Sequence, residues 1–288
     1  LTLSSLDTNT FRGQYIVTGG IVRAGLRASA AAKMFVGHGK TYAAPSLRAS
    51  YLLPRASISA FFEGKGIDSS AYTDVTARVT PFSFVSLMGS VGRASDNHVE
   101  DSSFTTNYAR AELGLRIHNL WFVGGVVQRD SVSLRPPIVY DTLFVPRGDG
   151  RRTGMTAAIR GQLWRVIHTD ISALRWTDTA GLYRPQYQIR SELFVRTNLL
   201  DRFPSGNLGS LFSAVHEYRS GARFPIGKTA TFLAPGYRTI STLLEIRILS
   251  ATVSWQFRNL LGERYSQVPP FIGPRQTNFY GVRWEFLN

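Results

Sequence analysis

The feature that most constrains this chain is a two-residue alternation of apolar and polar side chains along most of its length. In residues 251–258, with the sequence ATVSWQFR, every odd-numbered residue is apolar and every even-numbered residue is polar. Residues 107–117 and 239–248 show the same pattern. A period of two is typical of a β-strand whose two faces meet different surroundings. The chain is therefore predicted to be all-β.

Turn residues such as Pro81, His118-Asn119 and Pro235-Gly236 divide the chain into about 14 predicted strands, with 13 to 15 as the range. The remaining alternating or strand-like runs lie near 21–28, 46–52, 55–63, 72–80, 82–92, 119–129, 155–164, 166–176, 187–196, 208–218 and 278–286. Very short connections alternate with longer ones, predicted at 94–103, 131–151, 220–237 and 259–276. Residues 1–10 are predicted to be a polar lead-in, with disorder as one interpretation, and residues 11–288 a single β domain.

Composition excludes several classes of protein. Hydrophobic residues make up 43% and charged residues 18%, so the chain is predicted to be folded rather than disordered. The absence of cysteine excludes disulfides, thiolate zinc sites and cysteine nucleophiles. No run of about 18 uninterrupted apolar residues exists, so no transmembrane helix is predicted.

The polar face carries acid and arginine residues two positions apart, which places them on the same side of a strand. Arg110/Glu112 and Arg190/Glu192 are examples. Such pairs suit a wet barrel interior, and aromatic residues near strand ends suit the interfacial girdles of a membrane barrel. The alternation of short turns with long loops is also typical of outer-membrane barrels. We therefore predict a closed, antiparallel, up-and-down transmembrane β-barrel of about 14 strands; a soluble all-β binding or structural protein is the alternative.

The last 50 residues resemble the end of a TonB-dependent outer-membrane receptor. The aromatic strand 253–257 leads into 258–265, with the sequence RNLLGERY, and then into Pro269-Pro270 and Gly273-Pro274-Arg275. The closing strand, 279–286, has the sequence FYGVRWEF. Its Gly281, Trp284 and Phe286 are similar to the signal by which the barrel-assembly machinery recognises a final strand.

The resemblance implies a multi-pass protein of the bacterial outer membrane that binds a small solute or passes it across that membrane. The partners that it implies are outer-membrane lipids and the barrel-assembly machinery, with TonB or a plug domain if the chain is part of a longer receptor. A transporter barrel of about 22 strands needs more residues than this chain has. The chain is thus interpreted as the C-terminal part of a receptor or as a small, plugless, anion-leaning porin.

Charged residues of the polar faces are the candidates for lining the lumen and setting selectivity. They are Arg110, Glu112, Arg116, Arg160, Arg190, Glu192, Arg196, Glu245, Arg247, Arg258, Arg283 and Glu285. An excess of arginine on a pore wall favours anions. The alternative left open is that these arginines pair with the glutamates and hold the strand register.

No enzymatic chemistry is predicted. The five histidines are scattered, and neither a Gly-x-Ser-x-Gly elbow nor a P-loop is present, so no catalytic, cofactor or metal site is expected. The formal net charge of +14 would suit nucleic acid in a soluble protein. The arginines are spread over nearly every predicted strand rather than gathered in one patch, so no nucleic-acid partner is predicted.

Overall fold

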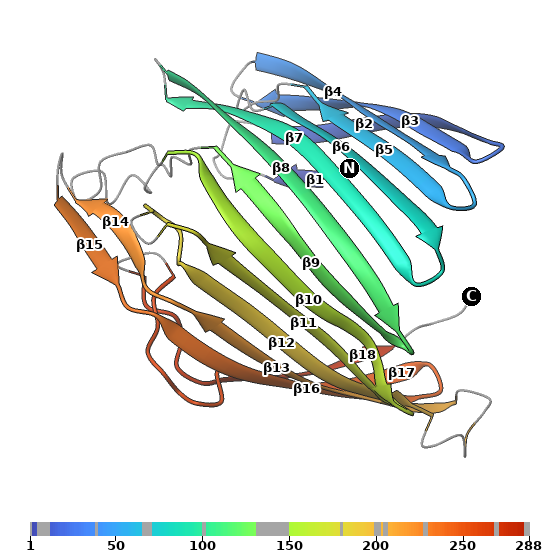
Figure 1. Cartoon of the computed structure of the whole chain (residues 1–288), viewed down its shortest axis with the longest axis vertical. Helices are drawn as coiled ribbons and strands as arrows, with labels where there is room; N and C mark the ends of the chain where they lie inside the picture. The colour runs from blue at the N-terminus through green and yellow to red at the C-terminus, as the bar shows by residue number, and fades with distance from the viewer. Residues whose placement is uncertain are drawn as a thin grey trace. The chain divides into compact units, whose positions relative to one another are not determined.

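The computed structural model describes residues 2–4, 12–37, 40–64, 71–99, 102–130, 150–178, 181–198, 203, 207–226, 230–267 and 271–284. Every regular element in these residues is a β-strand (Figure 1). The described residues contain no helix that is long and apolar enough to cross a membrane. The all-β prediction is confirmed.

Sixteen strands of the described part form one antiparallel sheet in which sequence neighbours pair, with β13 passing directly to β16. They are β1 (Thr2–Ser4), β2 (Arg12–Arg23), β3 (Leu26–Gly37), β4 (Lys40–Leu52), β5 (Ala56–Glu63), β6 (Ala71–Phe82), β7 (Val85–Val99), β8 (Ser102–Ile117), β9 (Leu120–Arg129), β10 (Arg152–Trp164), β11 (Ile167–Trp176), β12 (Tyr187–Thr197), β13 (Leu208–Arg219), β16 (Tyr237–Ile248), β17 (Ala251–Arg258) and β18 (Thr277–Trp284). A second sheet contains β14 (Ala222–Ile226) and β15 (Ala230–Ala234). Among the described pairings, none joins β1 to β18.

The predicted strand count of about 14 is too low, since the described residues hold 16 strands in the main sheet alone. The run predicted at 21–28 spans a tight turn between β2 and β3, where Ala24 and Gly25 have φ angles of 42° and 84°. The alanine-rich β3 has too little apolar contrast to show a period of its own. The loop predicted at 94–103 is largely strand, and the loop predicted at 220–237 contains β14 and β15. In these hairpins, backbone pairing continues beyond the residues in which apolar and polar side chains alternate, so the strands are longer than the alternation predicts.

The chain divides into two compact units. The first contains Leu1–Leu113 with Val126–Arg135, and the second contains Gly114–Gly125 with Pro136–Asn288. Within the lead-in, β1 pairs with residues 12–14 of β2, whereas residues 5–11 lie outside the described residues. A single barrel domain over residues 11–288 stays a prediction.

In the first unit, one face of the sheet from β4 to β7 is apolar and exposed. Its cross-strand partners are themselves apolar: Leu47 opposes Phe62, and Tyr51 opposes Ile58. All four side chains are exposed. The opposite face of the same strands is polar, with Ser46 opposite Glu63 as an example. The alternation therefore separates an uncovered apolar face from a polar one, as expected.

In the second unit, a row of apolar cross-strand partners runs without interruption over seven strands. From β10 to β18 it contains Trp164, Ile167, Val195, Phe212, Leu244, Trp255 and Tyr280. Trp255 is 52% exposed and Tyr280 is 85% exposed. Aromatic and aliphatic side chains of this size are normally buried in a soluble domain. Here the row stands on the open face of a single sheet layer.

The buried apolar cluster among the described residues is small and lies beside β14 and β15. It contains Leu182, Tyr183, Ala222, Phe224 and Ala234. The backbone nitrogen of Tyr183 donates to the carbonyl of Arg223 at 2.7 Å, and its ring meets that of Phe224 edge-on. This cluster packs a connection between strands, so it does not cover the apolar face of the sheet.

Candidate functional site

The polar face of the second unit is the candidate site, because the strand register places on it all the lumen candidates that lie in β10–β18 and are described. The register pairs Arg160 with Asp170 and Asp170 with Glu192, and it pairs Arg190 with Glu217. Partners and residues two apart share a face. The described candidates on this face are Arg160, Arg190, Glu192, Arg196, Glu245, Arg247, Arg258 and Arg283.

Ion pairs and hydrogen bonds cross this face from β10 to β13. Arg160 Nε lies 3.0 Å from Asp170 Oδ1, and Arg190 Nη2 lies 2.9 Å from Glu192 Oε2. Arg190 Nε also lies 3.6 Å from Glu217 Oε1. Exposed pairs of this kind contribute about 0–1 kcal/mol each, so their main effect is on the local field and on register rather than on stability.

Sequence reasoning missed Asp170 and Glu217. The notable pairs in the sequence are two residues apart, whereas Arg160 and Asp170 are partners across a hairpin, and Arg190 and Glu217 are partners across β12 and β13. These two carboxylates and the guanidinium of Arg219 add to the charges that the sequence placed on this face. Only the register identifies them.

The remaining candidates of β12–β18 line up in two rows. Arg196, Leu211, Glu245 and Ser254 are successive partners, and Arg247, Thr252 and Arg283 form the next row. Arg258 sits over the ring of Phe279, 4.9 Å from its centre, on the same face. The guanidinium group is thus held by a cation–π contact with an aromatic ring. Glu285 lies outside the described residues.

On β8, the candidates Arg110, Glu112 and Arg116 occupy one side of the strand. Arg110 Nε donates to Glu112 Oε1 at 2.7 Å, so this pair forms as its spacing predicts. Arg116 Nε donates instead to the carbonyl of His118 at 3.1 Å. On the charged side of β8, the carboxylate of Glu112 therefore offsets the charge of Arg110.

A hydrogen-bonded aromatic cluster occupies the first unit. The hydroxyls of Tyr72 and Tyr108 lie 2.6 Å apart, and the Tyr108 hydroxyl donates to a carboxylate oxygen of Asp74. The ring of Tyr108 lies against Gly92, where a Cβ would overlap it. Phe61 packs beside Tyr72 with ring centres 5.7 Å apart. A glycine on β7 therefore makes room for an aromatic side chain from β8.

The segment after β17 is organised by a buried asparagine. Asn259 is 3% exposed and has a φ of 50°. Its side-chain nitrogen donates to the carbonyl of Glu263 at 2.8 Å and to that of Pro274 at 3.1 Å. One amide thus connects the turn after β17 to the segment just before β18. The sequence identified this residue only as part of a resemblance.

Tyr265 completes this turn. Its ring lies against Gly273, where a Cβ would overlap it, and it packs beside Tyr237 with ring centres 4.8 Å apart. The backbone nitrogen of Gly273 donates to the Tyr265 carbonyl at 2.7 Å. The separate sequence elements RNLLGERY and Gly-Pro-Arg therefore form one structural unit.

The predicted assembly signal is only partly described. Trp284 opposes Ala251 and is exposed on the apolar face, whereas Gly281 opposes Ser254 on the polar face. Phe286 lies outside the described residues. The assembly role of these three residues stays a prediction.

The described residues contain no group of three or more His, Asp or Glu side chains that could hold a metal ion. His168 stacks on Phe194 with ring centres 5.1 Å apart, and the two are cross-strand partners. What the candidate site offers is therefore a broad charged surface with arginine, carboxylate and hydroxyl groups.

No family model matches the sequence, and no curated protein matches it. Solved structures do match the fold. The FrpB iron transporter from Neisseria meningitidis matches with a TM-score of 0.57 and 9% identity, over 96% of this chain and 55% of that one. The chain has the strand architecture of the TonB-dependent siderophore-receptor barrels. At this level of identity, the likeness to these receptor barrels is one of fold.

Two further receptor barrels give the same result. The siderophore receptor PirA from Acinetobacter baumannii matches with a TM-score of 0.54 and 10% identity, over 96% of this chain and 55% of that one. The pyoverdine outer membrane receptor FpvA from Pseudomonas aeruginosa matches with a TM-score of 0.52 and 11% identity, over 96% and 53%. The chain thus spans about half the length of these three receptor chains. TonB-dependent receptor barrels are transporters rather than enzymes.

Proposed function

We propose that this chain is an integral β-barrel element of the bacterial outer membrane that binds a small solute or passes it across the membrane. The observation that carries the proposal is the uncovered apolar row from Trp164 to Tyr280, which lies opposite a polar, arginine-rich face. A strand can satisfy both faces at once when lipid contacts one and water the other. The strand architecture of siderophore-receptor barrels supports the same assignment.

The polar face is proposed to line the solute passage. Its arginines, carboxylates and hydroxyls can hydrogen-bond a polar solute, and no chemical step is needed for binding or passage. Closure would come either from pairing of β1 with β18 or from further strands of a longer receptor. In the second case TonB and a plug domain would be partners, as they are for receptors of this fold.

The proposed membrane topology is testable with neighbouring residues that face opposite ways. Since the chain has no cysteine, Val253→Cys and Ser254→Cys each introduce one thiol on β17. In carbonate-washed outer membranes, a membrane-impermeant maleimide is expected to label Ser254→Cys several times faster than Val253→Cys, because lipid shields the apolar face. After unfolding in urea the two rates should converge.

Release of the protein by the carbonate wash would favour the soluble all-β alternative and contradict the proposal. Equal labelling of both thiols in the washed membranes would also contradict it. An unboiled sample that migrates differently from the boiled band near 32 kDa would show in addition that this chain folds into a closed barrel without other strands.

An anion-leaning pore is the second candidate, favoured by Arg247 and Arg258 on the polar face. Replacing both with alanine is expected to lower the ratio of chloride to potassium permeability, measured as the reversal potential of the chain in a planar bilayer under a salt gradient. Arg238→Ala is the matched control, because Arg238 is on the opposite side of β16 and pairs with Glu263 at 3.1 Å. An unchanged reversal potential in the double variant would remove these arginines from selectivity.

A further inference from the structure

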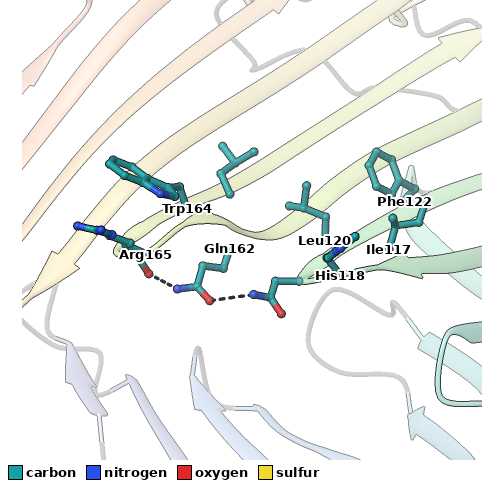
Figure 2. Close-up of a pocket in the computed structure, with 9 residues that line it drawn as sticks. Ile117, His118, Leu120, Phe122, Gln162, Trp164 and Arg165 are labelled. Carbon is teal, nitrogen blue, oxygen red and sulfur yellow. Dashed lines mark hydrogen bonds between the residues drawn. The ribbon is translucent and has the colours of Figure 1, made fainter.

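A groove of about 520 Å³ lies in the second unit, where the tight turns β8–β9 and β10–β11 come together. Its volume is within the range of ligand sites, about 300–1,000 Å³. Figure 2 shows the side chains of Trp164, Leu120 and Phe122 on one side of the ribbon and the amide of Gln162 on the other. The lining residues are Ile117, His118, Asn119, Leu120, Phe122, Gln162, Leu163, Trp164 and Arg165.

An irregularity in β10 shapes the apolar floor. The register with β11 shifts between Gln162 and Trp164, and Gly161 has a φ of 137°. A Cβ at Gly161 would overlap the Asn119 carbonyl, so this close approach of the two turns requires glycine. Leu163 lies within this irregularity, between Gln162 and Trp164, and Trp164 pairs with Ile167 on the apolar face. Both Leu163 and Trp164 are exposed.

The rim of the groove is polar and is held by hydrogen bonds between the two turns. Gln162 donates through its backbone nitrogen to the Asn119 carbonyl at 3.2 Å and through its side chain to the Arg165 carbonyl. The Arg165 guanidinium lies 5.1 Å from the centre of the Trp164 ring. None of the nine lining residues is acidic, and His118 stands beside Arg116. The rim therefore presents the Arg165 guanidinium next to an apolar floor.

We propose that this groove binds an anionic phospholipid, with the headgroup phosphate at Arg165 and an acyl chain along Leu163, Trp164 and Phe122. The inference rests on the proposed membrane function, since it needs the apolar face to meet lipid. A water-soluble anion has no apolar part that could pack against the apolar floor, whereas a lipid has its acyl chains. A basic rim without an acidic residue favours a lipid of net negative charge over a zwitterionic one. Arginine combined with an interfacial tryptophan matches both parts of such a lipid.

The absence of cysteine allows a direct test. Leu163→Cys and Val253→Cys, labelled with bimane, report on the groove and on a control position. The control is matched: Leu163 is 49% exposed and Val253 is 46% exposed, and each lies within three residues of a tight turn at the same end of the second unit. The labelled chains are placed in vesicles that mix phosphatidylglycerol and phosphatidylcholine, with brominated acyl chains on one lipid or the other.

At position 163 we expect brominated phosphatidylglycerol to be enriched about fivefold over brominated phosphatidylcholine as a quencher, from the attraction of one basic residue near an anionic surface. Position 253 should show no enrichment. Arg165→Gln should abolish the enrichment, whereas Arg175→Gln, an arginine over Tyr187 at the other end of β11, should retain it. Phe122→Cys serves as a second reporter within the groove.

Equal quenching by both lipids at 163 and 122 would overturn the lipid site and leave the membrane function standing. Enrichment that survives Arg165→Gln would also overturn it, because the headgroup would then not be held at Arg165. If neither brominated lipid quenched the bimane at position 163 or at position 253, the apolar face would not meet lipid, and both proposals would fall.

Discussion

Replacing Asn259 with alanine is expected to destabilise the chain by about 2–4 kcal/mol. The variant loses two hydrogen bonds of a buried amide, to the carbonyls of Glu263 and Pro274, at about 0.5–1.5 kcal/mol each. It also places alanine at a φ of 50°, which costs about 1 kcal/mol more. The measurement is a urea unfolding titration in detergent or lipid, followed by tryptophan fluorescence.

Two companion variants separate these contributions. Asn259→Gly removes the amide but tolerates the positive φ, so it should regain about 1 kcal/mol relative to the alanine variant. Asn278→Ala changes an exposed asparagine of β18 and should stay within about 0.5 kcal/mol of the parent. If Asn259→Ala were no more harmful than Asn278→Ala, the amide would not hold the turn together.

A methyl group added at Gly92 is expected to cost about 2–4 kcal/mol in the same titration. A Cβ at this position overlaps the Tyr108 ring, which must move and break its hydrogen bonds to Tyr72 and Asp74. Gly89→Ala is the matched control in β7, since a Cβ there meets nothing within 4 Å. It should be neutral or slightly stabilising.

A double-mutant cycle tests the mechanism of this loss. Tyr108→Phe keeps the ring but removes the hydroxyl, so it should cost about 1–2 kcal/mol alone. The double variant Gly92→Ala/Tyr108→Phe should lose less unfolding free energy than the sum of the two single variants, because the alanine has already displaced the hydroxyl. Full additivity of the two changes would contradict a shared network.

The sequence alone predicted the strands well where apolar contrast is high and poorly where it is low. Residues 251–258 are strand β17 as predicted, whereas the run predicted at 21–28 covers only the end of β2, the turn and the start of the alanine-rich β3. The turn at Ala24-Gly25 also lacks the Asn-Gly or Asp-Gly signal that marks a hairpin in sequence. Contrast and turn chemistry therefore set the limit of prediction for the strands.

The sequence predicted the residue types of the candidate site, but not which residues pair with one another across strands. Arg190 and Glu192 pair as their spacing suggests, since two residues apart in a strand is a local relation. The pair of Arg160 and Asp170 joins two strands, and the sequence of neither strand indicates which residue of the other strand is its partner. The same is true of Asn259, whose second acceptor is the carbonyl of Pro274.

The sequence by itself determined that this chain forms strands with an apolar face and an arginine-rich polar face, because a period of two is a property of the local backbone. The tertiary structure decided which strands pair and in which register. A shift of two residues leaves every side chain on its own face while changing every cross-strand partner, so alternation cannot specify register. The row from Trp164 to Tyr280, the pairing of Arg190 with Glu217 and the lipid groove at Arg165 all depend on that register.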